Sequence, residues 1–280
     1  METRVSSATR EVIIADGQPT VLIGERINPT GKKKLAEALK AGNLEIVSSE
    51  ALAQVQAGAD IIDINVGVVS VDEVSLLPRV VQAVMGAVDV PLCLDSASPQ
   101  ALAAALKVYK GKPLINSVTG EEHSLEKVLP LVREYGTAVI GLLQDDEGVP
   151  SNPERRLAIA HKIIDRAQAV GIPGHDIVID CLACTVGADT NAGVVTIETI
   201  RRVKAELGVN LTLGASNVSF GLPDRDQLNS AFVAMAIAAG VTCLIVDIAR
   251  VRSMVLAADL VLGHDRHARR YIEAYRQRQK

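Results

Sequence analysis

The sequence predicts one (β/α)8 barrel domain, an α/β TIM barrel, with a short N-terminal β-hairpin. Eight short runs rich in Val, Ile and Leu each stop at a polar residue and are followed by a helical pattern, as expected for parallel strands buried on both faces. The length of 280 residues is near the roughly 250 that such barrels occupy. Hydrophobic residues make up 48% of the chain and aromatic residues only 2%, which suits a barrel filled by aliphatic side chains.

The N-terminal segment, residues 1–19, is expected to hold the hairpin. Its predicted arms are Glu11–Ala15 and residues 20–23, because Asp16-Gly17 between them supplies the positive φ of a tight turn. The barrel is expected over residues 20–263, and a basic, polar closing helix over residues 264–280. The eight barrel strands are expected to end at Ile27 and to cover residues 60–65, 91–96, 113–117, 138–143, 176–181, 211–216 and 243–248.

Helical patterns with apolar residues at three- and four-residue spacing separate these strands. Ser98-Pro99 and Asn152-Pro153 each predict an N-cap followed by proline in the first turn. Four glycines fall where helices should end: Gly58, Gly136, Gly171 and Gly240.

The charge balance excludes some partners. With 29 basic and 33 acidic residues the net charge is −4, so no nucleic acid is expected to bind. The chain shows neither a secretion signal nor a run of eighteen apolar residues, so we expect a cytoplasmic protein without a membrane span. The four cysteines are interpreted as small apolar fillers, although Cys181 and Cys184 form a C-x-x-C that would also fit a redox pair or half a zinc site.

Polar residues at the strand ends form the candidate site, because the carboxyl ends of barrel strands surround the concave polar surface. No Lys ends a strand, no His lies in one and no Gly-rich phosphate turn follows one, so covalent catalysis, a protein-bound metal and a phosphate site are not expected. Asp247 is left out of the site, since it could pair with Arg250 or Arg26. The strand ends read Glu25, Asp63, Asp95, Asn116, Gln144, Asp180, Asn217 and Asp247.

Six of these strand-end residues mix carboxylates with amides, which suits a planar fused heterocycle with several donors and acceptors on its edges. Asp63 and Asn65 face the same way on one strand, and each either contacts the ligand or braces loops. The six candidates are Asp63, Asn65, Asp95, Asn116, Asp180 and Asn217.

Longer strings around these residues resemble the pterin-binding barrel family, and within it the methyltetrahydrofolate:corrinoid methyltransferases, including the folate module of cobalamin-dependent methionine synthase. The resemblance covers nearly the whole chain, from Val21 to about Leu262. Two departures, Cys181 in place of a frequent Pro and Ala215 in place of a frequent Leu, imply loop differences only. The matching strings are Gly24-Glu-Arg-Ile-Asn-Pro-Thr30, Asp63-Ile-Asn-Val-Gly67, Cys93-Leu-Asp-Ser96, Ile115-Asn-Ser117, Ile179-Asp180 and Gly214-Ala-Ser-Asn-Val-Ser-Phe-Gly-Leu-Pro223.

The resemblance implies a role for each candidate. Asp95, Asn116 and Asp180 would hold the pterin by its pyrimidine edge and ring nitrogens, and Asn217 would reach N5, the nitrogen that carries the methyl group. Asp63 and Asn65 match a motif near the pocket, and Arg225 matches an Arg after the strand-seven loop. Asn217 and Asp180 would be catalytic, Asn217 by a hydrogen bond to N5 and Asp180 by holding a water that delivers the proton.

The implied reaction moves the N5 methyl group between methyltetrahydrofolate and the cobalt of a corrinoid (cobalamin). Residues 265–270 begin like an Asp-x-His-x-x-Gly corrinoid motif but lack its Gly, so the corrinoid is expected on a separate partner protein. Relatives suggest a homodimer. The alternatives are dihydropteroate synthase, whose pyrophosphate loops have no counterpart here, a non-catalytic folate-binding protein, and a barrel whose polar rim is only structural.

Overall fold

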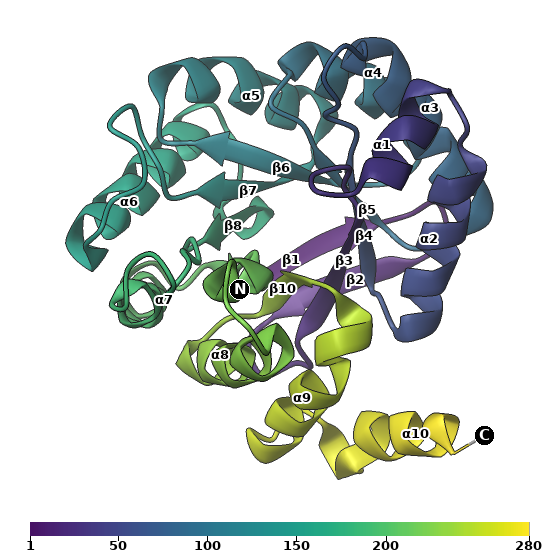
Figure 1. The fold of residues 1–280 in the computed structure, drawn as a ribbon. Coiled ribbons are helices and arrows are strands. Elements are labelled where there is room, and N and C mark those ends of the chain that lie inside the picture. The colour runs from purple at the N-terminus through teal and green to yellow at the C-terminus, as the bar shows by residue number, and fades with distance from the viewer. Residues whose placement is uncertain (280) are drawn as a thin grey trace.

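The computed structural model describes residues 1–279 and confirms the predicted barrel (Figure 1). Eight parallel strands follow one another in the order β10-β3-β4-β5-β6-β7-β8-β9. All eight predicted strands are present, within a few residues of the expected bounds. They are β3 (Val21–Ile27), β4 (Ile61–Asn65), β5 (Leu92–Asp95), β6 (Leu114–Thr119), β7 (Ala138–Leu142), β8 (Ile177–Asp180), β9 (Asn210–Thr212) and β10 (Cys243–Val246).

The cylinder closes between β9 and β10. Gly214 and Ile245 form a parallel bridge just beyond β9, and the Ile245 amide donates to the Leu213 carbonyl at 2.9 Å. The Thr242 amide donates to the Leu211 carbonyl at 3.1 Å. The last two strands are therefore joined by a few bonds, and the sheet has no free edge.

Helices surround the sheet in the βα order that the sequence predicts (Figure 1). The caps agree as well: Ser98 Oγ accepts the Ala101 amide at 3.2 Å, and Asn152 Oδ1 accepts the Arg155 amide at 2.8 Å. The helices are α1 (Lys33–Lys40), α2 (Glu45–Ala57), α3 (Glu73–Ala87), α4 (Pro99–Val108), α5 (Glu122–Tyr135), α6 (Pro153–Ala169), α7 (Ala192–Leu207), α8 (Arg225–Ala239), α9 (Ile248–Val261) and α10 (Arg269–Arg278), with 3-10 turns η1 (Gly174–Asp176), η2 (Ala215–Ser219) and η3 (Arg266–Ala268).

The N-terminal hairpin exists, but its predicted pairing is wrong. β1 (Glu2–Ser6) pairs antiparallel with β2 (Glu11–Ala15), so the turn lies at residues 7–10, and residues 20–23 belong to β3. Asp16-Gly17 instead turns the chain from the hairpin into the barrel. The physical reason is burial: β3 is apolar on both faces and pairs in parallel with β10 and β4, whereas β1 alternates between exposed and buried residues and suits a two-stranded sheet.

The hairpin closes the foot of the barrel, at the amino ends of the strands. Val5, Val12 and Ile14 form one apolar cluster with barrel residues such as Ile23. A second, larger core fills the layer between strands and helices. The polar end and the closed end of the barrel are therefore opposite each other.

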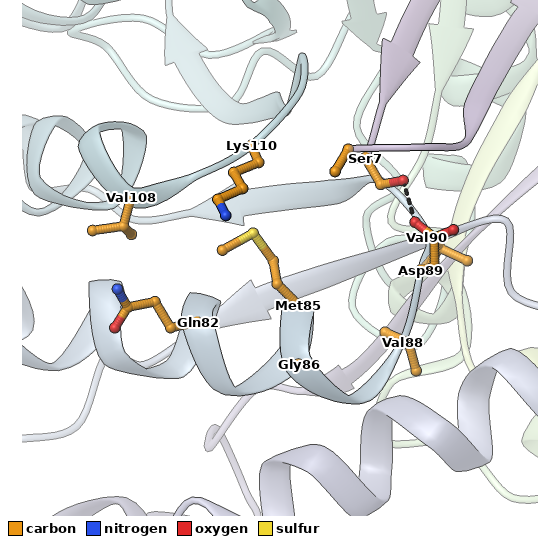
Figure 2. Close-up of a pocket in the computed structure, with 10 residues that line it drawn as sticks. Ser7, Gln82, Met85, Gly86, Val88, Asp89, Val90, Val108 and Lys110 are labelled. Atoms are coloured by element: carbon orange, nitrogen blue, oxygen red, sulfur yellow. Dashed lines mark hydrogen bonds between the residues drawn. The ribbon is translucent and has the colours of Figure 1, made fainter.

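A cavity of about 530 Å³ lies outside this foot, near the start of β5 (Figure 2). Met85, Asp89 and Lys110 line it, and the Ser7 hydroxyl donates to Asp89 Oδ1 at 2.5 Å. The Ser7 bond ties the turn of the hairpin to the loop before β5. This cavity is remote from the strand ends that carry the predicted site.

Within the segment predicted as a closing helix, residues 269–278 form α10. The buried Asp265 carboxylate accepts the amides of Arg270 and Tyr271 at 3.1 and 3.0 Å. Asp265, the first residue of the incomplete corrinoid motif, therefore acts as a helix cap. No helix within residues 1–279 is both long and apolar enough to cross a membrane.

Candidate functional site

Adjacent strand ends bring four of the predicted residues together. In the sheet register Asn65 on β4 lies beside Asp95 on β5, which lies beside Asn116 on β6. Asn65 Nδ2 donates to Asp95 Oδ2 at 2.9 Å, and Asn116 Nδ2 donates to Asp63 Oδ1 at 3.1 Å. The result is two coupled amide–carboxylate pairs at one mouth of the barrel.

The two carboxylates in these pairs both have raised pKa values. Burial raises the pKa of Asp95 to about 6, against the opposing effect of the Asn65 hydrogen bond. Burial, together with the charge of Asp95, raises the pKa of Asp63 well above its usual range. Burial and mutual repulsion thus favour the protonated form at this pair of carboxylates, while the amides of Asn65 and Asn116 favour the charged form.

Asp180 is the last residue of β8, and its side chain is buried. Its residue is 6% exposed, and Oδ1 accepts the Leu182 amide at 2.8 Å. Burial raises the pKa of Asp180 to about 6, while the amides of Leu182 and Gly214 and the charge of Arg156 hold it down. At neutral pH the carboxylate is ionised and keeps acceptor capacity for a ligand.

Asn217 is exposed in the 3-10 turn η2. A Cβ atom at Gly214 would come within 3.2 Å of Asn217 Nδ2, so a glycine gives that amide room to lie against the backbone that also supports Asp180. Arg225 fixes the turn, since its Nη2 donates to the Ser216 carbonyl at 2.8 Å and its Nε to Ser219 Oγ at 3.0 Å. Asp180 and Asn217 are thus joined through one short backbone segment.

A cavity of about 280 Å³ opens at this mouth along β5, β6 and β7. Asp95 and Asn116 line it, and so does Gln144, which the strand-end pattern also contained. Gln144 Nε2 donates to Glu121 Oε1 at 3.3 Å. The opening is lined by polar groups that can donate and accept hydrogen bonds.

Glu25 is a strand-end residue that was not among the six candidates, and it lies next to one of them in the structure. Ser216 Oγ donates to Glu25 Oε1 at 2.8 Å, which brings the end of β3 next to the segment that holds Asn217. Burial is the main cause of the raised pKa of Glu25, and burial also lowers the pKa of the neighbouring Lys32 ammonium. The sequence signal that could have identified Glu25 was its position as a polar residue at the end of a predicted strand.

Asp247, the last strand-end residue, is an ion-pair partner. It lies 3.4 Å from Arg26 Nη1 and 3.4 Å from Arg250 Nε. Both pairings considered from the sequence are therefore present.

The cysteines are free thiols, and Cys93, Cys181 and Cys243 are buried. Burial raises the pKa of Cys243 to about 12, so its thiol is neutral at neutral pH. Within residues 1–279, no group of three or more His, Cys, Asp or Glu side chains is arranged to hold a metal ion.

Known proteins with similar sequences place this geometry in context. The chain is 30% identical over 267 residues to the methylcorrinoid:tetrahydrofolate methyltransferase of Eubacterium limosum, covering 92% of this chain and 96% of that protein. It is 32% identical over 266 residues to the methionine synthase of Mycobacterium tuberculosis and 32% identical over 263 residues to that of Mycobacterium leprae. The match spans 22% of the length of each methionine synthase.

Among solved structures, Yersinia pestis DHPS with a pterine-sulfa conjugate superposes with a TM-score of 0.71 at 16% identity, over 93% of this chain and 99% of that one. At this identity the likeness shows the barrel fold alone. The sequence model described as pterin binding enzyme matches residues 24–247, which include every strand end of the candidate site. The chain therefore belongs to the family of pterin binding enzymes.

Proposed function

We propose that the protein is a methyltransferase that moves the N5 methyl group between methyltetrahydrofolate and the cobalt of a corrinoid. The similarity to the Eubacterium limosum methyltransferase, which extends over 96% of that protein, carries the proposal. The polar strand ends support it, because a ring of amides and carboxylates at one mouth suits the edge of a pterin.

In this proposal Asp95, Asn116 and Asp180 hold the pterin ring. The charged carboxylates of Asp95 and Asp180 accept bonds from ring and amino N–H groups, while the Asn116 amide offers both a donor and an acceptor. Asp63 and Asn65 contribute by orientation: each already binds a partner at 3.1 or 2.9 Å and fixes its rotamer. Pre-set partners reduce the entropy lost when the ligand binds.

Asn217 is assigned to N5. A tertiary amine is a poor leaving group, so the methyl–N5 bond breaks only as N5 gains a hydrogen bond or a proton. The exposed Asn217 amide can donate that bond, and a water held by Asp180 can relay the proton from solvent. The corrinoid cobalt supplies the nucleophile, so the barrel needs none of its own.

The corrinoid is proposed to arrive on a separate protein that docks at the barrel mouth. The one segment resembling a corrinoid motif lacks the glycine, and its Asp265 caps α10. We also place the reaction in the cytoplasm, because a low-valent cobalt requires a reducing compartment and the free thiols of this chain are compatible with one.

A homodimer completes the proposal. An apolar groove of about 420 Å³ runs between α7 and α8 on the outside of the barrel. Val194 and Met235, both in this groove, are 70% and 53% exposed. Apolar side chains gathered this way favour contact with another protein surface, and a second copy can offer the same groove in a two-fold arrangement.

The test is a spectrophotometric assay that follows consumption of Co(I) cobalamin in the presence of methyltetrahydrofolate. The expected result is methyl transfer by the wild-type chain. Asn217→Ala should lower the rate roughly 10- to 1000-fold and weaken tetrahydrofolate binding much less, because the Asn217 bond strengthens as N5 gains charge.

Asn191→Ala, which truncates an exposed asparagine at the start of α7, is the matched control and should leave both quantities unchanged. Wild-type transfer by Asn217→Ala would contradict the role of Asn217. Folate binding without transfer to cobalt would favour a folate carrier, and condensation of p-aminobenzoate with a pterin pyrophosphate would favour dihydropteroate synthase.

A further inference from the structure

Among residues 1–279, Arg156 is the largest fully buried side chain, yet no carboxylate forms an ion pair with it. The residue is 2% exposed, and none of the ion pairs found within residues 1–279 includes it. It also lies in the first turns of α6, where the helix dipole disfavours a positive charge. A buried guanidinium in this position is costly unless something in its surroundings makes use of it.

The acceptors around the guanidinium are neutral groups that come from three separate segments. Arg156 Nε donates to the Pro150 carbonyl at 2.9 Å, and Nη1 donates to the carbonyls of Cys181 and Leu182, both at 2.8 Å. Nη1 also lies 3.5 Å from Thr196 Oγ1, and Nη2 lies 3.7 Å from Cys184 Sγ. The Arg156 guanidinium therefore connects the loop before α6, the loop after β8 and helix α7.

The bond to Cys181 has a specific consequence for Asp180. The Cys181 carbonyl and the Leu182 amide belong to one peptide group, and that amide donates to Asp180 Oδ1 at 2.8 Å. The Arg156 guanidinium is therefore linked to the Asp180 carboxylate through a single peptide group, whose carbonyl binds the arginine and whose N–H binds the aspartate. A positive charge at the carbonyl polarises the peptide and strengthens the N–H as a donor.

The same loop needs external support for its backbone. Leu182 has a φ of +58°, a left-handed conformation that a leucine seldom adopts. Arg156 binds the carbonyl of this residue as well as that of the residue before it, so it holds the loop on both sides of the strained position.

We propose that Arg156 is a positioning residue for the methyl-transfer site, which through the Cys181–Leu182 peptide aims the Asp180 carboxylate at the substrate and keeps it negatively charged. The inference rests on the proposed function only in naming the substrate. Arg156 binds loops at the barrel mouth but none of the six candidate residues, so it acts on the ligand through the loop that holds Asp180.

The electrostatic surroundings of Asp180 make this testable. Arg156 from α6 is the charged group that acts on it, and the other titratable neighbours are the buried thiols of Cys181 beside it and Cys243 on β10. A positive charge favours the ionised carboxylate. Removal of the Arg156 charge therefore raises the pKa of Asp180, and neither thiol can compensate.

The experiment compares Arg156→Gln, Arg156→Lys and the control Arg155→Gln. Arg155 is the neighbouring residue on α6 and forms surface ion pairs with Asp145 and Glu147, so its loss removes the same charge without touching the Asp180 loop. Two readouts are used: tetrahydrofolate affinity across pH, and the NMR titration of the Asp180 carboxyl carbon, assigned by its loss in Asp180→Asn.

In Arg156→Gln the Asp180 titration should move to higher pH, and the dissociation constant at pH 7.5 should rise roughly 10- to 100-fold, as for a lost bond to a charged group. KM for methyltetrahydrofolate should rise more than kcat falls. Arg156→Lys keeps the positive charge but loses the several hydrogen bonds of the guanidinium. It should therefore keep the wild-type titration midpoint of Asp180 and still bind the folate more weakly. Arg155→Gln should match the wild type in every readout.

Two results would overturn the inference: an unchanged Asp180 titration in Arg156→Gln, or wild-type folate affinity in Arg156→Lys. If Arg156→Gln does not fold, the Lys variant alone decides, because a purely structural role predicts restored affinity once it folds. A wild-type chain that neither binds tetrahydrofolate nor transfers methyl would overturn the proposed function, and the carboxyl titration would still decide whether Arg156 acts on Asp180.

Discussion

At the residue scale, the site concentrates carboxylates in places that a stable fold would avoid. Asp63 and Asp180 are 3% and 6% exposed, and burial raises the pKa of each. Hydrogen bonds from the protein offset only part of the free-energy cost of removing these carboxylates from water. Buried carboxylates with acceptor capacity to spare are expected of a binding site that trades stability for affinity.

Asp180→Asn should therefore stabilise the free protein at alkaline pH. The pKa of Asp180 rises from 3.8 to about 6 on folding, so the folded state favours the proton, and stability is lost as pH rises through this window. Asparagine cannot ionise, and it should raise the free energy of unfolding by up to about 3 kcal/mol at pH 8 and by little at pH 4. The variant should also bind tetrahydrofolate more weakly.

Thermal unfolding at both pH values, with and without tetrahydrofolate, measures this trade. Asp165→Asn on the exposed face of α6 is the control and should change Tm little at either pH, because exposed side chains contribute little to stability. A change in Tm that is the same at pH 4 and pH 8 would contradict the assignment of the buried charge to Asp180.

At the element scale, the strands were predictable because each is apolar on both faces and bounded by turn residues. β4 and β8 are buried along nearly their whole length, and the polar residue that ends each was read directly from the sequence. The hairpin was predicted with the wrong partner because Asp16-Gly17 is a stronger local turn signal than residues 7–10. Local turn chemistry cannot show that Val21–Ile27 gains two buried parallel neighbours.

The hairpin should contribute to stability and not to chemistry. Ile14 is fully buried against the inside of the barrel, and its carbonyl accepts Asn210 Nδ2 at 2.8 Å. Ile14→Ala should lower the free energy of unfolding by about 2 to 5 kcal/mol, as for a large-to-small change in a packed core. Methyl transfer well below the unfolding temperature should stay within about twofold of wild type, because the barrel mouth lies at the other end.

Ile13→Ala provides the comparison, since Ile13 lies on the other face of β2 and is half-buried. Its effect on denaturant unfolding should be smaller than that of Ile14→Ala. Equal losses for the two variants would mean that the hairpin does not seal the barrel foot.

At the scale of the whole molecule, the eight strand ends converge only because the sheet closes. The sequence supplied the list of polar ends, but not which of them touch. The Asn65–Asp95 and Asn116–Asp63 pairs cross between strands, and Glu25 approaches Ser216 over 191 positions of sequence. Arg156 was missed for the same reason: its acceptors lie on three segments, and a lone arginine in a helix gives no signal of them.

The proposed dimer is the remaining whole-molecule feature, and it can be broken at one residue. Val194 projects from α7 into the apolar groove and is 70% exposed, so Val194→Glu would place a charge within the interface. Burying an unpaired carboxylate is costly, and dissociation relieves that cost. Val194→Glu should convert a species of twice 29.6 kDa into one of 29.6 kDa in sedimentation equilibrium. Val261→Glu, at an 85% exposed valine of α9 outside the groove, should remain dimeric; a wild-type chain of 29.6 kDa would rule the dimer out.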